Sequence, residues 1–490
     1  MKRTLIVVVY VLGIALSACG GSADETIDED DDQNSSAVTA TTSQSEEQST
    51  PTESSVVEPT AVEPTAQPEE TEAVPTEVAA SPTSPPQPTA TEVPAVTQED
   101  ITIVSQGFGQ PEGEEELGWA VVLENPNVSQ AIENSQYQVA MMDAAGTVLE
   151  TDSGYINLIL PDERLGLSGV IYLPDGSAAA TMDVTFEWGE AVASDVSDSF
   201  GTSQVTYFAD EFSSKVSGVI TNPYTTDLED LRVSAVALDT AGEIIGGGFA
   251  YLGFVPASGQ TGVQVLVTTS AEPATVELFA SISSLTTMAE DADQATDASA
   301  LILGGQGFGQ DIDFGGVGWA FLVENPNPDM GVELSRYQVS AYNDAGVVIG
   351  VDNEYMSLLL PAEKTGMSGT LYVPEQAVVA RLDVQLLAGD FNAMDAAPLF
   401  ATESVAFIAD DFLPKVTGIV KNLTDVTLEN LRTSAIAYND AGEIIGGGYS
   451  FLESVPGQGQ AAADVSVTTT GVPARVELYP AVSGLTDLSP

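Results

Sequence analysis

Residues 231–248 read LRVSAVALDTAGEIIGGG and contain the elements that decide the fold. Leu231 and Val233 alternate with Arg232 and Ser234, and a period of two is typical of a β-strand with one buried face. The alternation predicts that the Leu and Val side chains face the core and that Arg232 and Ser234 face outward. The tetrad 239–242 ends in glycine, which accommodates the positive φ of a tight connection, so the stretch predicts a β-hairpin.

The same stretch belongs to a long internal repeat. Ala241–Gly248 recurs as Ala441–Gly448, and Gln106–Gln110 recurs as Gln306–Gln310, each after 200 residues. A weaker repeat lies inside each half, where Asp143-Ala144-Ala145-Gly146 parallels residues 239–242 after 96 residues. Repeats of this kind indicate structural units that recur along the chain. We therefore expect four related modules in the order ABAB.

The modules are predicted to be β-sandwiches. Short alternating runs recur about every 8–12 residues, and no segment shows an apolar stripe at the helical period. The predicted fold class is all-β, with four tandem immunoglobulin-like β-sandwich modules after a signal peptide and a disordered acidic stalk. We expect sandwich A1 at residues 100–199 and sandwich B1 at 200–285. After a linker at 286–300, sandwich A2 follows at 301–399 and sandwich B2 at 400–490.

The N-terminus predicts export and a lipid anchor. Lys2 and Arg3 precede about a dozen apolar residues, a run too short for a membrane-spanning helix but suited to a signal peptide over residues 1–18. Leu16-Ser17-Ala18-Cys19 resembles the bacterial lipobox, which implies that Cys19 is lipidated and becomes the first mature residue. The alternative is an ordinary signal peptide with an incidental cysteine. The lipobox implies a membrane partner and an extracytoplasmic place in the cell envelope, on the outer membrane or the outer face of the cell membrane.

Residues 19–99 are predicted to form a disordered acidic stalk. Pro, Thr, Ser and Glu dominate and aromatic residues are absent, so the segment cannot bury enough apolar surface to fold. Asp28–Asp32 is an acidic run without the glycine turn and closing glutamate of a helix–loop–helix calcium loop, which favours a solvated charge run over a calcium site.

The charge balance excludes several functions. The chain has 12 Lys and Arg against 73 Asp and Glu, no His and a single Cys, for a net charge of −61. Nucleic-acid binding requires clustered basic residues. His-based catalysis, His-ligated metals and intrachain disulfides are excluded by the same counts. We assign no catalytic residue, no cofactor and no metal ligand.

Glycine-rich motifs recur in both halves without the helix that a dinucleotide fingerprint requires. Gly107-Phe108-Gly109 and residues 305–309 predict a β-bulge or a tight strand entry. Gly246–Gly248 and Gly446–Gly448 predict a bulge or a close backbone approach within a strand. A binding role for the strand edge that they flatten is the alternative.

Three other sets of residues recur after 200 residues. The acidic pairs Asp210-Glu211 and Asp410-Asp411 predict exposed turns, because neighbouring strand residues point to opposite faces. The alternative is a weak Ca²⁺ site or a carboxylate pair, with nearby acids at Glu112, Glu114 to Glu116, Asp311 and Asp313. Lys215 and Lys415 are expected to pair with carboxylates rather than to catalyse. Trp119 and Trp319 are expected in the core, with an exposed glycan platform as the alternative.

The order of turn signals resembles known bacterial sandwiches. Asn325-Pro326-Asn327 is followed by Tyr342-Asn343-Asp344-Ala345-Gly346 and then by Leu360-Pro361. This order resembles FxLYD domains, and it is also similar to the water-stress and hypersensitive-response domain. Both resemblances imply an immunoglobulin-like fold without catalytic residues, and the second implies a protectant role during drying.

The expected function is that of a non-enzymatic surface protein, a binding, adhesion or spacer module whose partner is an envelope protein or a glycan. A desiccation protectant is the first alternative. A Ca-dependent module or a carboxylate-based hydrolase is the second.

Overall fold

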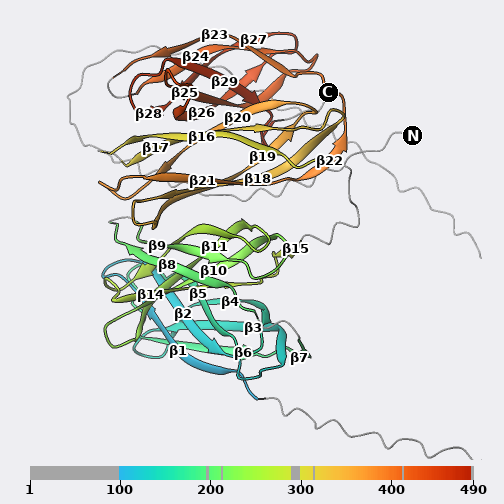
Figure 1. The fold of residues 1–490 in the computed structure, drawn as a ribbon. Coiled ribbons are helices and arrows are strands. Elements are labelled where there is room, and N and C mark those ends of the chain that lie inside the picture. Colours follow the sequence, from blue (N-terminus) through green and yellow to red (C-terminus); the bar gives the residue numbers. More distant parts are fainter. Residues whose placement is uncertain are drawn as a thin grey trace, which may run out of the picture. The chain divides into compact units, whose positions relative to one another are not determined.

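The computed structural model describes residues 99–194, 198–210, 213–288, 298–312, 315–410 and 413–486. They belong to one compact unit, residues 92–490. The predicted signal peptide, Cys19 and the predicted stalk up to residue 98 lie outside the described residues. Every element assigned within the described ranges is a β-strand, and all the strand pairs are antiparallel, so the predicted all-β class is confirmed (Figure 1).

Module A1 consists of two sheets packed face to face. Sheet β1-β2-β5 covers sheet β4-β3-β6, and β7 pairs with β3 at the edge. Its strands are β1 (Thr102–Gly109), β2 (Glu116–Glu124), β3 (Gln130–Met142), β4 (Val148–Ile159), β5 (Arg164–Tyr172), β6 (Thr181–Glu187) and β7 (Glu190–Ala193).

Module B1 repeats this arrangement with a wider inner sheet. Sheet β13-β11-β10-β14, with β15 paired to β10, packs on sheet β12-β9-β8. Its strands are β8 (Gly201–Phe208), β9 (Lys215–Thr221), β10 (Leu228–Leu238), β11 (Ile244–Val255), β12 (Gln260–Leu266), β13 (Thr268–Thr269), β14 (Thr275–Ser281) and β15 (Thr287–Met288).

The second half has the same topology. Module A2 has sheets β16-β17-β20 and β19-β18-β21, and module B2 has sheets β28-β26-β25-β29 and β23-β24-β27. The A2 strands are β16 (Ile302–Asp311), β17 (Gly316–Glu324), β18 (Met330–Tyr342), β19 (Val348–Leu359), β20 (Lys364–Tyr372), β21 (Arg381–Leu387) and β22 (Asp390–Ala393). The B2 strands are β23 (Phe400–Ile408), β24 (Lys415–Asn422), β25 (Leu428–Tyr438), β26 (Ile444–Val455), β27 (Gln460–Ser466), β28 (Thr468–Thr469) and β29 (Arg475–Ala481).

The predicted hairpins form at the glycine tetrads. The Asp143 carboxylate accepts hydrogen bonds from the amides of Ala145 and Thr147, both at 2.8 Å. Gly146 adopts a φ of 81°, a conformation that residues with a side chain rarely take. The same turn joins β10 to β11, where Asp239 accepts from Ala241 and Glu243. Local side-chain chemistry therefore fixes the register of each hairpin.

A buried asparagine explains the Asn-Pro-Asn motif. The Asn125 side chain is fully buried and donates to the carbonyl oxygens of Gln130 (2.9 Å) and Leu160 (2.8 Å). Its Oδ1 accepts from the Asn127 amide at 3.1 Å. One side chain thus ties the end of β2 to the start of β3 and to the end of β4. Equivalent buried asparagines stand at Asn222, Asn325 and Asn422.

The face of β10 predicted to be exposed is covered by the neighbouring module. Ser234, which was expected to face outward together with Arg232, is fully buried, and its repeat Ser434 is 1% exposed. The reason is tertiary, because β10 and β11 pack against β5 and β2 of module A1 (Figure 1). The prediction was wrong for Ser234, since this sheet is buried on both faces.

Candidate functional site at the module junctions

Glycines line the junction between modules A1 and B1. A Cβ placed on Gly118 would collide with the carbonyl oxygens of Gly247 and Thr268. A Cβ on Gly107 would lie 2.5 Å from the carbonyl oxygen of Ile244. A Cβ on Gly247 would lie 2.8 Å from the carbonyl oxygen of Trp119. Strand β1 at Gly107 therefore lies against Ile244, and strand β2 at Gly118 lies against Gly247, so the backbones of the two modules touch.

The two glycine motifs differ in whether they form a bulge or a close backbone approach. The register shift in β1 lies between Ile103 and Ser105, so the motif at residues 107–109 marks a close approach rather than a bulge, whereas the shift in β16 lies between Leu303 and Gln306 and places the predicted bulge at the start of residues 305–309. The triglycine strand combines a register shift opposite Ala237 and Leu238 with the close approach, which confirms its prediction. Each motif alone predicted a local irregularity in its own strand. Only the fold shows that both motifs lie at the same junction between modules.

Two side chains add polar contacts across this junction. The Ser168 hydroxyl donates to the Gly248 carbonyl oxygen at 2.6 Å. The Arg232 guanidinium donates through Nη2 to the Ser168 carbonyl oxygen at 2.5 Å and lies 3.7 Å from the centre of the Phe249 ring. Ser368, Gly448 and Arg432 repeat these contacts in the second half. Both junctions are therefore held by equivalent serine, glycine and arginine residues.

A buried tryptophan and a carboxylate lie beside each junction. Trp119 is fully buried and donates through Nε1 to Asp152 Oδ2 at 3.1 Å, and Trp319 donates to Asp352 at 3.0 Å. Burial is the main reason that the pKa of Asp152 is raised and that the pKa of Asp352 rises to about 6. The predicted core position of both tryptophans is confirmed, which excludes them as exposed glycan platforms.

The second junction contains an ion pair where the first has a glycine. Glu354 accepts a hydrogen bond from the Tyr337 hydroxyl at 2.9 Å and pairs with the buried Arg432 guanidinium. The equivalent residue in the first half is Gly154, whose added Cβ would lie 2.5 Å from the Tyr137 hydroxyl oxygen. The negative charge of Glu354 further raises the pKa of Asp352, after the larger effect of burial.

Exposed aromatic rings continue each junction outward. Phe249 and Tyr251 are 38% and 41% exposed and meet edge to face, with ring centres 5.8 Å apart. Tyr449 and Phe451 repeat the pair at 5.8 Å, and Phe451 is 43% exposed. Aromatic faces beside carboxylates offer apolar contact and hydrogen-bond acceptors together. We call residues 249, 251, 449 and 451 the aromatic edges.

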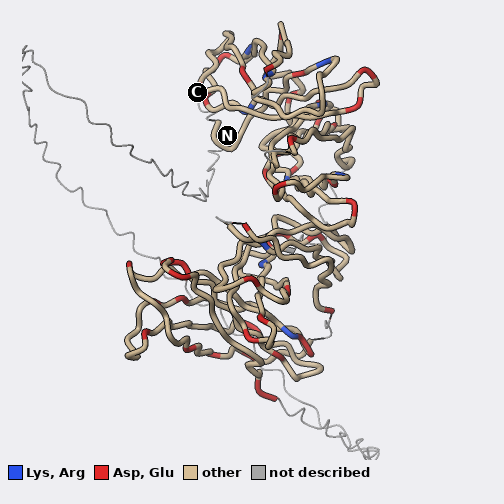
Figure 2. Tube along the Cα trace, turned by 90° about the vertical axis from the view of Figure 1, so that its left-hand side faces the viewer, with Lys and Arg blue, Asp and Glu red and all other residues tan. Residues whose placement is uncertain are grey.

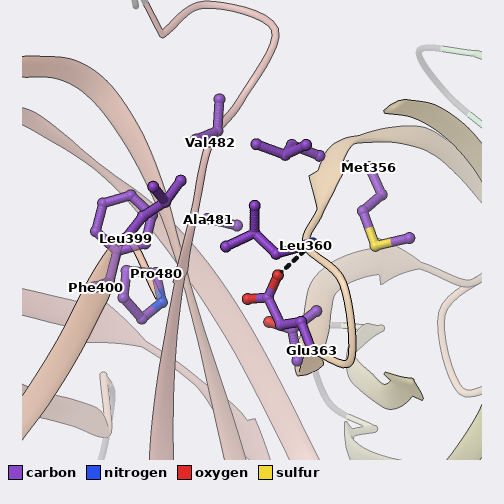
Figure 3. A pocket seen from close by; sticks show the side chains of 10 residues that line it. Met356, Leu360, Glu363, Leu399, Phe400, Pro480, Ala481 and Val482 are labelled. Carbon is purple, nitrogen blue, oxygen red and sulfur yellow. Dashed lines mark hydrogen bonds between the residues drawn. The ribbon is translucent and has the colours of Figure 1, made fainter. Parts of the chain in front are cut away.

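A buried glutamate closes a loop near each junction. Glu163 is 5% exposed and accepts a hydrogen bond from the Leu160 amide at 2.6 Å, and burial raises its pKa to about 7. Glu363 repeats this bond to Leu360 at 2.7 Å, and burial raises its pKa too. In Figure 3 Glu363 lies beside a hollow that Leu399 and the neighbouring B2 residues line. Its cavity volume of about 10 Å³ holds roughly one water molecule, too little for an organic ligand.

A different contact joins module B1 to module A2. The Arg336 guanidinium pairs with Glu229 at 2.9 Å and with Asp230 at 2.8 Å, and it also donates to the Gly253 carbonyl oxygen at 2.8 Å. The Gln338 amide donates to the Gly262 carbonyl oxygen at 2.6 Å. We call this contact the central join.

Apolar side chains and one hydroxyl complete the central join. The Ser217 hydroxyl donates to the Val348 carbonyl oxygen at 2.6 Å. Val219, Tyr342 and Val348 form one buried cluster. Unlike the glycine-lined junctions, the central join is made mainly by side chains, with Arg336 and Gln338 of β18 reaching both sheets of module B1.

The first residue of each acidic pair lies in a loop rather than on a strand. Asp210 follows the end of β8 at Phe208 and accepts from the Ser213 amide at 3.2 Å, and Asp410 accepts from the Leu413 amide at 3.0 Å. Both aspartates are exposed, in agreement with the predicted acidic turns. Asp210 and Asp410 were expected to point to one face of a strand and their neighbours to the other, and this was wrong because both aspartates lie in loops. Glu211 and Asp411 lie outside the described residues.

One of the two recurring lysines has a carboxylate partner. Lys415 pairs with Asp464 at 3.1 Å, which agrees with the predicted cation pairing.

Figure 2 shows acidic residues on every described module. Within the described ranges no group of three or more Asp, Glu, Cys or His is arranged to hold a metal ion. Asp313, one of the acids considered for calcium, is not among them. The described residues include no helix long and apolar enough to span a membrane.

No family model matches the sequence, and no curated protein matches it. Among solved structures, the chain is similar to the BSP domain of a biofilm associated protein, with 9% identity, a TM-score of 0.13 and coverage of 82% of this chain and 97% of that chain. It is also similar to Escherichia coli alpha-2-macroglobulin activated by porcine elastase, with 10% identity, a TM-score of 0.12 and coverage of 79% and 44%. Both TM-scores are too low for either structure to contribute to the functional argument.

Proposed function

We propose that this chain is a non-enzymatic, lipid-anchored protein of the bacterial cell envelope that presents binding modules outside the cytoplasm. The lipobox at residues 16–19 supports the anchor, and the tightly joined modules support a role in display or spacing. The observation that carries the proposal is the glycine-lined junction. Backbone contact through Gly118 and Gly247, with the Ser168–Gly248 hydrogen bond, fixes the two modules of each half against each other.

Rigid pairs of modules suit a protein that holds a surface at a set position. Two sandwiches joined by a free linker reorient, whereas sandwiches with a shared buried face move together. The hollow beside Glu363 is too small to enclose an organic substrate, and the carboxylates at the junctions already accept hydrogen bonds from Trp119, Trp319 and Tyr337. These features favour presentation over catalysis.

The aromatic edges are the proposed ligand surface. They leave ring surface open to solvent, and in the second half Tyr449 lies near the carboxylates of Glu354 and Asp352, which suits the apolar face and hydroxyl groups of a sugar. The proposed ligand class is therefore an envelope glycan, with an envelope protein as the outcome to distinguish. The asparagine-tied turns at residues 125, 222, 325 and 422 support membership of the FxLYD-type sandwiches.

The anchor is tested by incorporation of labelled palmitate into the full chain and into Cys19→Ala. We expect the substitution to abolish labelling and to release the protein from the membrane fraction. Labelling that survives in Cys19→Ala contradicts the anchor.

The ligand surface is tested by binding the full chain to a glycan panel. Tyr251→Ala combined with Phe451→Ala is expected to reduce binding at least tenfold, or about 1.4 kcal/mol. Tyr172→Ala with Tyr372→Ala is the matched control, because these tyrosines are 66% and 68% exposed and stand at the ends of β5 and β20. Equal loss from both pairs would remove the assignment to the aromatic edges.

A further inference from the structure

The two outermost sheets of the described modules are repeats of the two sides of the central join. Sheet β19-β18-β21 of module A2 contacts β9 and β12 of module B1. The repeat of the first side is sheet β4-β3-β6 of module A1, and the repeat of the second is sheet β23-β24-β27 of module B2 (Figure 1). We call the outward faces of these two sheets the A1 end face and the B2 end face.

The end faces keep apolar side chains that the central join buries. Val348 is fully buried in the join, whereas its repeat Val148 is 53% exposed on the A1 end face. Val219 is 3% exposed in the join, and its repeat Ile419 is half-buried on the B2 end face. Each end face therefore has an uncovered apolar centre at the position where the join packs one.

The ion pair of the central join has no counterpart between the end faces. Arg336 becomes Gln136 on the A1 end face. Of its two acidic partners on β10, Asp230 becomes Asn430 and Glu229 is kept as Glu429, and both stand on β25 in the other sheet of module B2. The Gln136 amide can donate a hydrogen bond to either side chain, so no cation is set against an amide.

A larger side chain on one end face is matched by a smaller one on the other. A Cβ on Gly262 would lie 2.7 Å from the Ser340 Oγ within the central join. The B2 end face has Ala462 in place of the glycine, and the A1 end face has Ala140 in place of the serine. The added methyl group on one face thus meets the face that has lost the hydroxyl.

We propose that copies of this chain associate head to tail, with the A1 end face of one copy on the B2 end face of the next. The proposal rests on the geometry of the central join and is independent of the lipid anchor and the glycan site. The charged side chains Lys415 and Lys421 of the B2 end face are paired with Asp464 and Glu403 within that face. When the A1 end face of one copy binds the B2 end face of the next, one end face of each copy remains free. Further copies can therefore add to both ends and form an open chain.

The contact is expected to be weaker than the central join. It lacks the Arg336 ion pair, and it unites separate molecules that each have a net charge of −61. Because this repulsion is screened by salt while apolar contact is not, association should strengthen as the salt concentration rises.

Sedimentation velocity over a concentration series tests the proposal on the full chain with Cys19→Ser, so that no lipid drives association. We expect the average sedimentation coefficient to rise with concentration, and more steeply at high salt. Val148→Glu or Ile419→Glu should weaken association at least tenfold by placing a charge at the apolar centre. Val128→Glu and Val472→Glu are matched controls, because these residues are 77% and 78% exposed in loops away from the end faces.

A gain-of-function pair completes the test. Gln136→Arg with Asn430→Asp restores, between copies, an arginine with both acidic partners of the central join and should tighten association about tenfold. Asn430→Asp alone should not tighten it, and Gln136→Arg alone, which meets only Glu429, should tighten it less than the pair. A wild-type chain that stays monomeric while this double variant associates would show that the end faces are caps, which overturns the proposal. Association that survives Val148→Glu combined with Ile419→Glu overturns it as well. Circular dichroism and melting temperature confirm that each variant is folded.

Discussion

The A–B junctions and the central join connect neighbouring modules by opposite means. At the junctions, glycines bring two backbones into contact, and the same contacts recur in both halves. At the central join, long side chains such as Arg336 and Gln338 reach across from module A2 to module B1. A backbone contact tolerates no added atom, whereas a side-chain contact adjusts. The difference indicates that each half folds as one unit and that the two halves dock.

The largest expected effect comes from filling a glycine junction. Gly318→Ala places a methyl group against the carbonyl oxygens of Gly447 and Thr468 and should destabilise the second half by about 3 kcal/mol or more. Gly316→Ala is the matched control on the same strand, because an added Cβ there meets nothing within 4 Å. Urea unfolding of both variants measures the difference, and equal stabilities would contradict the close approach.

The next effect depends on pH and on the buried glutamates. The ordinary pKa of a glutamate is 4.5, and burial raises the pKa of Glu163 to about 7. Between these values the folded state binds the proton that the unfolded state has released, so stability falls as pH rises from about 4.5 to 7. The loss amounts to roughly 3 kcal/mol, and Glu163→Gln should remove it.

Urea unfolding at pH 5 and at pH 7.5 measures this dependence. Glu150→Gln is the control, because Glu150 is exposed on β4 of the same module. A pH dependence that Glu163→Gln leaves unchanged would assign it to other carboxylates, among them Asp352, whose pKa is about 6.

A smaller effect separates the two A–B junctions. Glu354→Gly reproduces residue 154 and leaves the Arg432 guanidinium, whose side chain is 7% exposed, without its ion-pair partner. Because the Glu354 side chain is itself 35% exposed, we expect a loss of only about 1–2 kcal/mol. Thermal unfolding measures it against Glu375→Gly in an exposed loop of the same module. A loss no larger than that of the control would show that the ion pair contributes nothing.

The smallest effect on stability is expected at the central join. Arg336→Gln introduces the residue found at position 136 and should change the unfolding free energy by about 1 kcal/mol or less, because the ion pair is partly exposed. Its effect should instead be a broader distribution of distances between spectroscopic probes placed on modules B1 and A2. A narrow, unchanged distribution would indicate that apolar packing around Val348 alone holds the join.

Much of the fold was predictable because it depends on local signals. Period-two alternation gave the strands, and the tetrads ending in Gly146 and Gly242 gave the hairpins that the structure confirms. The junction site was only half predictable. The glycine motifs were recognisable, but nothing local indicated that residues 107–109 would meet Ile244 and Ile245, or that Gly118 would meet Gly247. Arg232 and Ser234 were placed outward for the same reason, since alternation marks two faces without showing what covers them.

By itself, the sequence determined the all-β class, the 200-residue repeat, the hairpin turns and the absence of histidine chemistry. These follow from residue type and short-range spacing, which act through local backbone preferences. Only the tertiary structure decided that the two glycine motifs form one junction, that Ser234 is buried, and that Arg336 joins the halves. Those contacts depend on which sheet faces which, and that is fixed by the packing of whole surfaces far apart in the chain.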